Sequence, residues 1–168
     1  VLLQISDPAN IDLVRQLVQR GANDNARTSK EPRDGNRNML NRIGSTPFLM
    51  AAKNDDVPLM RVLLDVGADP SLKTNRGTTA LMVAAGVGIW APGENPGTHE
   101  EALAAMKLAL EVGGGAVNDV DMDGEAALHA HVRANHKDLL DRINATGDYD
   151  KDIEAGLRKA LQDFRSTG

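Results

Sequence analysis

Residues 44–76 read GSTPFLMAAKNDDVPLMRVLLDVGADPSLKTNR, and they predict two short helices followed by a turn. Thr46 is placed to cap the first helix. Pro47 suits its first turn, because the N–H that proline lacks would have no intrahelical partner there. The second helix has apolar residues at helical spacing and ends at Gly67, which can adopt the left-handed conformation that closes a helix. We therefore expect a helix-turn-helix unit.

Both halves of this unit recur along the chain, which indicates an internal repeat. The second helix has three gap-free copies, each with a basic residue in third place and a glycine at the end, at residues 13–21, 59–67 and 105–113. The first helix opens after Gly44, Gly77 and Gly124. The first two of these glycines are 33 residues apart, so we take 33 residues as the underlying unit, lengthened elsewhere by two inserts.

These motifs resemble the ankyrin repeat family over about residues 10–124. The resemblance implies an all-α, helix-turn-helix solenoid of about three repeats, here interrupted by two long insert loops. The sequence departs from the Thr-Pro-Leu-His motif of the family, because Leu49 and Met82 occupy the His position in two copies. The third copy keeps His129 but has Ala126 in place of Thr, and losing that cap is expected to cost ~1 kcal/mol.

The resemblance also implies a binding surface, since solenoids present an extended concave face of turn tips and first helices to a protein partner. The first insert, roughly residues 27–42, carries five basic and two acidic side chains and is a second candidate. A passive loop is the alternative for this insert. The candidate contacts are Arg33, Arg37, Lys73, Thr74, Asn75, Arg76, Asp119 and Asp121.

The second insert, roughly residues 86–101, is expected to be a loop between the two helices of one repeat. A basic residue on each second helix, at Arg15, Arg61 and Lys107, predicts a ladder of positive charge along the outside of the solenoid. A solvated outer face is the simpler interpretation of that ladder.

Residues 125–167 depart from the repeat. Their pattern is set by Val132, Asn135, His136, Leu139, Leu140, Ile143, Asn144, Thr146, Gly147, Tyr149, Asp152, Ile153, Glu154, Leu157, Leu161, Phe164 and Thr167. These residues predict a two-helix tail, with helices over 125 to about 144 and 151–165. They resemble the C-terminal end of the F-type ATP synthase alpha subunit. We expect an ankyrin-like domain at 1–124 and this tail at 125–168. A natural fusion, an artificial chimera and a sequence-assembly join all remain open.

The predicted function is therefore that of a non-catalytic protein-protein interaction module. The alternative is a structural segment of an F-type ATP synthase alpha subunit, carried by the tail. Nucleotide binding is not implied, because the glycine-rich phosphate-binding loop of that family is absent. A net charge of −5 and only 2% aromatic residues disfavour nucleic acid as a partner. No arrangement of Ser, His and Asp suggests an active site.

Two patterns resemble metal sites, and we expect neither to bind a metal. Residues 119–124 read DVDMDG, like the first half of a calcium loop, but Ala130 stands where the bidentate Glu would be required. His129 and His136 share a helix face without a carboxylate beside them. The absence of cysteine excludes thiolate sites and disulfides.

Targeting signals are not evident. The longest apolar stretch, residues 80–90, is far shorter than the ~20 residues that a membrane span needs. We expect a soluble protein, with a cytoplasmic location favoured. The chain starts at Val1 without an initiator Met, so we also expect it to be a piece of a longer protein.

Overall fold

The computed structural model describes residues 8–31, 39–89, 96–146 and 151–165. Within these ranges the chain forms eight helices and no β-strand, apart from an isolated bridge residue at Ile89. The helices are α1 (Pro8–Gln19), α2 (Pro47–Lys53), α3 (Val57–Val66), α4 (Ala80–Ala84), α5 (His99–Glu111), α6 (Ala127–Asn135), α7 (Lys137–Thr146) and α8 (Lys151–Arg165). The all-α solenoid predicted from the repeats is confirmed.

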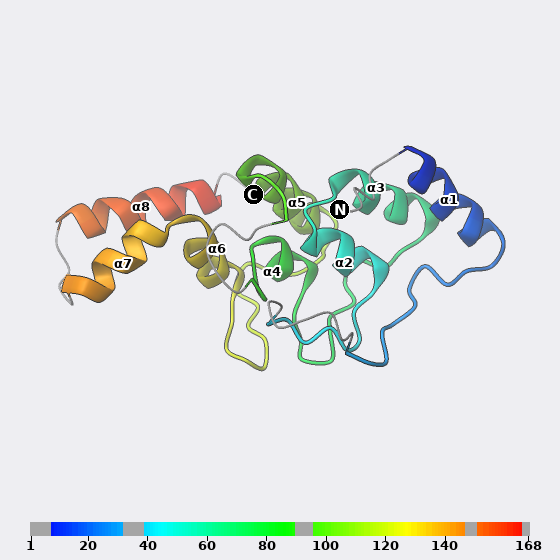
Figure 1. Ribbon diagram of the computed structural model, residues 1–168, viewed down its shortest axis with the longest axis horizontal. Helices are drawn as coiled ribbons and strands as arrows, with labels where there is room; N and C mark the ends of the chain where they lie inside the picture. The colour runs from blue at the N-terminus through cyan, green and yellow to red at the C-terminus, as the bar shows by residue number, and fades with distance from the viewer. Residues whose placement is uncertain (1–7, 32–38, 90–95, 147–150, 166–168) are drawn as a thin grey trace.

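Two complete helix pairs, α2 with α3 and α4 with α5, form the centre of the solenoid. Helix α1 packs against α3 on one side, and α6 packs against α4 on the other, so the helices follow one another along the long axis of the molecule (Figure 1). The main core is made of aliphatic, alanine and methionine side chains, with Phe48 and Phe164 as its aromatic members. Stacked helix pairs of this kind are the architecture of repeat proteins.

Each complete helix pair has a threonine cap at its first helix, and the cap predicted at Thr46 is present. The Thr46 hydroxyl oxygen accepts a hydrogen bond from the Leu49 N–H at 3.2 Å, and Thr79 accepts one from Met82 at the same distance. Gly67 ends α3 with φ 110°, in the left-handed region. Ala126 has the same extended backbone as the two threonines and makes no side-chain cap, as the sequence predicted.

The two inserts meet at their described ends. The Met39 N–H donates to the Gly88 carbonyl at 3.1 Å, and Leu40 is buried in the main core. Gly88 lies so close to Leu40 that a side chain at position 88 would overlap it. The second insert does run between α4 and α5, as predicted, and its described part begins again at Pro96.

The tail differs from the expected single helix over residues 125–144. That helix is interrupted at His136, whose φ of −130° and ψ of 50° end α6 and separate it from α7. Apolar spacing continues through both segments, so the sequence pattern gives no sign of a one-residue break. The break turns α7 away from the solenoid, and α8 then runs back beside α7 toward α5 (Figure 1).

Candidate interaction surface

The loops that precede α2, α4 and α6 project from the same side of the solenoid (Figure 1). Backbone hydrogen bonds join neighbouring loops. The Asn75 N–H donates to the Ile43 carbonyl, and the Met122 N–H donates to the Arg76 carbonyl, each at 2.9 Å. Gly44 lies against the Asn75 side chain with φ 83°, so a side chain at position 44 would both overlap Asn75 and strain the backbone. The loops therefore form one continuous surface.

Two of the predicted contact residues, Thr74 and Asp121, are buried inside these loops. The Thr74 hydroxyl oxygen accepts from the Thr78 N–H at 3.1 Å, and the Thr78 hydroxyl donates to Asp121 at 2.9 Å. The other Asp121 oxygen accepts from the N–H groups of Asp123 and Glu125. Because these polar groups are satisfied within the chain, Thr74 and Asp121 hold the shape of the loops and link one loop to the next.

Charged side chains pair across neighbouring loops at their tips. The Lys73 ammonium lies 3.0 Å from the Asp119 carboxylate, and the Arg76 guanidinium binds both oxygens of Asp123. Hydrogen bonds from the Ala116 N–H and from Lys73 lower the pKa of Asp119, and Arg76 lowers that of Asp123. Exposed ion pairs of this kind add little to the stability of the fold. Their charged groups lie at the surface, where a binding partner can reach them.

The sequence analysis did not identify the apolar side chains at the tip of the α5–α6 loop. Val120 is 61% exposed and Met122 is 73% exposed. The alternation of acidic and apolar residues in DVDMDG could have indicated them, because Asp121 points inward to hold the turn and its two neighbours then point outward. We call the group formed by the following exposed or half-buried residues the turn-tip surface: Lys73, Asn75, Arg76, Asp119, Val120, Met122 and Asp123.

The first insert places its basic residues in different surroundings. Arg33 and Arg37 lie outside the described residues. Arg27 donates to the Lys73 carbonyl at 2.5 Å, and the buried Arg42 forms an ion pair with Glu31 at 2.8 Å. Arg27 therefore joins the insert to the loop that precedes α4, whereas the Arg42–Glu31 pair lies within the insert.

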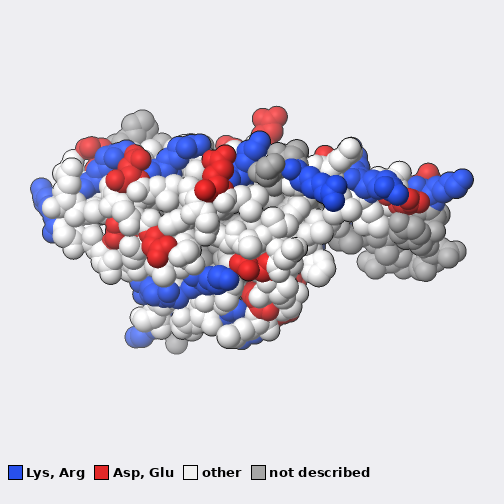
Figure 2. Space-filling view, turned by 180° about the vertical axis from the view of Figure 1, so that it is seen from behind, with Lys and Arg blue, Asp and Glu red and all other residues white. Residues whose placement is uncertain are grey.

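The predicted basic ladder lies on second helices, away from the turn tips. Seen from behind, Lys and Arg side chains recur along the upper edge of the molecule, with acidic side chains between them (Figure 2). Arg15 on α1 is bound to Asp65 on α3 at 3.0 Å. The mixture of charges agrees with a solvated outer face.

In the described part of the chain, no group of three or more His, Cys, Asp or Glu side chains has the geometry of a metal site. The described residues also contain no helix that is both long enough and apolar enough to cross a bilayer.

Comparison with known proteins gives two separate likenesses. A family model that spans three copies of the ankyrin repeat matches residues 3–89. The curated relatives that the chain matches include ATP synthase alpha subunits. That of Chromohalobacter salexigens is 40% identical over 70 residues, which cover 39% of this chain and 14% of that subunit.

Two further relatives show the same partial coverage. The alpha subunit of Colwellia psychrerythraea is 50% identical over 52 residues, covering 31% of this chain and 10% of that subunit. Subunit alpha 2 of Legionella pneumophila strain Corby is 50% identical over 44 residues, covering 26% and 8%. The chain thus spans only a small fraction of the length of the relatives that it matches, while carrying ankyrin repeats that cover half of its own length.

Proposed function

The chain belongs to the ankyrin repeat family, and from this membership we propose that it is a non-catalytic protein-protein interaction module whose turn-tip surface contacts the partner. The exposure of Val120 and Met122 carries this proposal. Apolar side chains at the centre of a patch, with charged groups around them, are typical of protein interfaces. Methionine adapts its shape to a partner because its side chain is unbranched and flexible.

Hydrogen bonds hold the loop that carries Val120 and Met122 in place, which favours a role for these side chains in binding. Asp121 lies between them and is fixed by hydrogen bonds from Thr78 and from two backbone N–H groups. A contact that is already held in place loses less conformational entropy on binding. The charged pairs at the tip contribute both signs, so the partner surface should carry complementary charges around an apolar centre.

Partner capture with matched variants tests the proposal. Met122→Glu alters the turn-tip surface, whereas Arg61→Glu alters an exposed residue on α3. We expect proteins captured by the unmodified chain to be lost with the first variant and retained with the second. Retention of every captured protein by Met122→Glu would place the interface elsewhere. Exchange of Arg33 and Arg37 for Glu tests whether the basic insert takes part.

A structural role beside ATP synthase subunits is the second candidate. The partial identity of this chain to those relatives and the resemblance of residues 125–167 to the end of that subunit motivate it. Co-purification of the chain with synthase subunits, lost when residues 125–168 are removed, would support this candidate. Equal recovery of the subunits with the shortened chain would argue against a role for the tail.

A further inference from the structure

The methionines of the chain divide into an exposed and a protected group, and they carry all of its sulfur because cysteine is absent. Met122 and Met39 are 73% and 66% exposed, and Met122 is the most exposed large apolar side chain among the described residues. The other four methionines are buried or half-buried: Met50, Met60, Met82 and Met106. Oxidants in solution reach a thioether at the surface and are kept from one inside a close-packed core. Met122 and Met39 are therefore the positions open to oxidation in the folded chain.

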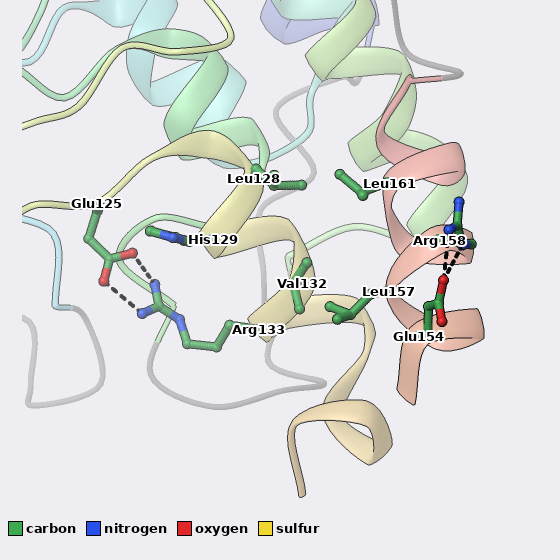
Figure 3. Close-up of a pocket in the computed structure, with 9 residues that line it drawn as sticks. All are labelled: Glu125, Leu128, His129, Val132, Arg133, Glu154, Leu157, Arg158 and Leu161. Atoms are coloured by element: carbon green, nitrogen blue, oxygen red, sulfur yellow. Dashed lines mark hydrogen bonds and ion pairs between the residues drawn. The ribbon is translucent and has the colours of Figure 1, made fainter. Parts of the chain in front are cut away.

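The groove of about 780 Å³ between α6 and α8 offers no sulfur to an oxidant. Figure 3 shows its apolar lining, which consists of Leu128 and Val132 on α6 and Leu157 and Leu161 on α8. These side chains lack the polarisable sulfur on which mild oxidants act. Oxidation therefore changes the turn-tip surface and leaves this groove as it is.

The hydrogen bonds that hold the Met122 loop do not involve the Met122 side chain. The Asp121 carboxylate accepts from the Thr78 hydroxyl at 2.9 Å and from two backbone N–H groups. The backbone N–H of Met122 donates to the Arg76 carbonyl at 2.9 Å, and this contact leaves the sulfur free to react. An oxygen added to that sulfur changes the chemistry of the surface without disturbing the loop beneath it.

We propose that Met122 is a reversible oxidation site, at which hydrogen peroxide converts the thioether to a sulfoxide and weakens partner binding at the turn-tip surface. This inference rests on the function proposed above. A lone pair of Met122 Sδ forms a bond to one peroxide oxygen as the O–O bond breaks, and the proton on the transferred oxygen passes to the departing hydroxide. The sulfur is oxidised by two electrons, and the peroxide is reduced to the oxygen of the sulfoxide and one water.

The product differs from methionine in polarity, because its sulfoxide oxygen is a hydrogen-bond acceptor beside the exposed Val120. A partner that covers the apolar centre of the surface would bury this oxygen without a donor, which we expect to weaken binding roughly tenfold or more. Methionine sulfoxide reductases, one for each epimer of the sulfoxide, reverse the step with two thiols as the reductant. The thiols become a disulfide, and the sulfoxide oxygen leaves as water.

Peptide mapping by mass spectrometry tests the chemistry without any partner. The folded full chain is treated with hydrogen peroxide, and the gain of one oxygen is followed at each methionine. We expect Met122 and Met39 to be oxidised at least roughly tenfold faster than Met60, Met82 and Met106, while circular dichroism shows an unchanged helical fold. Oxidation of Met122 no faster than that of the buried methionines would overturn this inference and leave the proposed function standing.

Capture of proteins from a cell lysate then tests the effect on binding, after the peroxide has been removed. Met39→Leu is the matched variant, because Met39 is similarly exposed but lies outside the turn-tip surface. Treated Met39→Leu should lose the same proteins that Met122→Glu loses, and methionine sulfoxide reductases should restore their capture. Treated Met122→Leu, compared with its own untreated sample, should show no change.

Two outcomes separate a failure of this inference from a failure of the proposed function. Proteins that are lost with Met122→Glu but retained by the chain oxidised at Met122 would overturn the inference alone. Proteins that are retained by Met122→Glu would overturn the proposed function, and the inference with it, because the turn-tip surface would not be the interface. A loss that the reductases do not reverse would also overturn the inference, since it would come from damage elsewhere.

Discussion

The ring of Phe164 lies 5.6 Å from the imidazole of His131, measured between ring centroids, and this contact joins the last helix of the chain to the solenoid. His131 is on α6 and is 1% exposed, and Phe164 on α8 is a member of the main core. The last helix, α8, is held at two places along its length. Phe164 gives it an anchor in the main core, while Ile153 and Ala160 pack with Leu139 in a smaller cluster.

We predict that the histidine at this junction makes the tail sensitive to acid. Burial lowers the pKa of His131 from 6.5 to about 4, helped by His136 and His99 and opposed by Asp163. The folded chain therefore keeps His131 neutral while the unfolded chain binds a proton between these values. We expect the stability that depends on neutral His131 to be lost as the pH falls from 6.5 toward 4.

Urea unfolding at pH 7.5 and pH 5 measures this effect. His131→Gln should flatten the pH dependence relative to the unmodified chain, by up to about 2 kcal/mol between these two pH values, at about 1.4 kcal/mol per pKa unit. His129→Gln, an exposed histidine on the same helix, is the matched control and should leave the dependence unchanged. If the free energy of unfolding changes with pH equally in His131→Gln and in the His129→Gln control, protonation of His131 does not destabilise this junction.

Asp55 should make the stability of the chain depend on pH in the opposite direction to His131. It follows α2 in the left-handed region with φ 56°, and burial raises its pKa from 3.8 to about 7, with Glu101 adding to the increase and the Gly97 N–H and Lys53 opposing it. The folded chain binds the proton more tightly than the unfolded chain, so stability should fall as the pH rises from 3.8 through 7.

Asp55→Asn keeps the shape of the side chain and suits the left-handed backbone, so it should stabilise the chain at pH 8 and remove this fall. The neighbouring variant Asp56→Asn preserves the cap of α3 and leaves Asp55 in place, so it serves as control. Thermal unfolding between pH 5 and pH 8 distinguishes them. A pH profile of Asp55→Asn that parallels the unmodified chain would contradict the prediction.

Restoring the missing cap should stabilise α6. Ala126 has φ −122° and ψ 158°, close to the φ −101° and ψ 165° of Thr46. Ala126→Thr should therefore accept a hydrogen bond from the His129 N–H and raise the free energy of unfolding by about 1 kcal/mol. Ala126→Val has the same shape without the hydroxyl and should give no such gain in chemical denaturation. Equal midpoints for the two variants would show that the hydroxyl makes no cap.

Removal of the Phe164 anchor should release α8. Phe164→Ala is expected to cost about 3 kcal/mol, because it leaves a cavity in the core. Leu161→Ala removes a side chain that is 40% exposed from the same helix and should cost much less. Amide hydrogen exchange should then be faster in α8 of the first variant while α2 to α5 remain protected. Uniformly unchanged exchange would show that Phe164 does not hold the tail.

The sequence by itself determined the repeat, because a helix-turn-helix unit is encoded locally. Apolar spacing, Thr46 and Thr79 as caps, and glycine at the helix ends each act within a few residues, so they could be interpreted without knowledge of distant contacts. The same local logic predicted that α6 would begin without a cap at Ala126.

Only the tertiary structure decided which side chains of the loops face outward and where the tail lies. Thr74 and Asp121 lie in polar turn sequences that suggested exposure, and both are buried where neighbouring loops share hydrogen bonds. His136 ends α6 within a segment whose periodicity continues, and its ring lies 5.6 Å from that of His131, between centroids. The burial of the two loop residues depends on contacts between segments that are far apart in the chain. The break at His136 lies within an uninterrupted apolar pattern. Local spacing carries no information about either outcome.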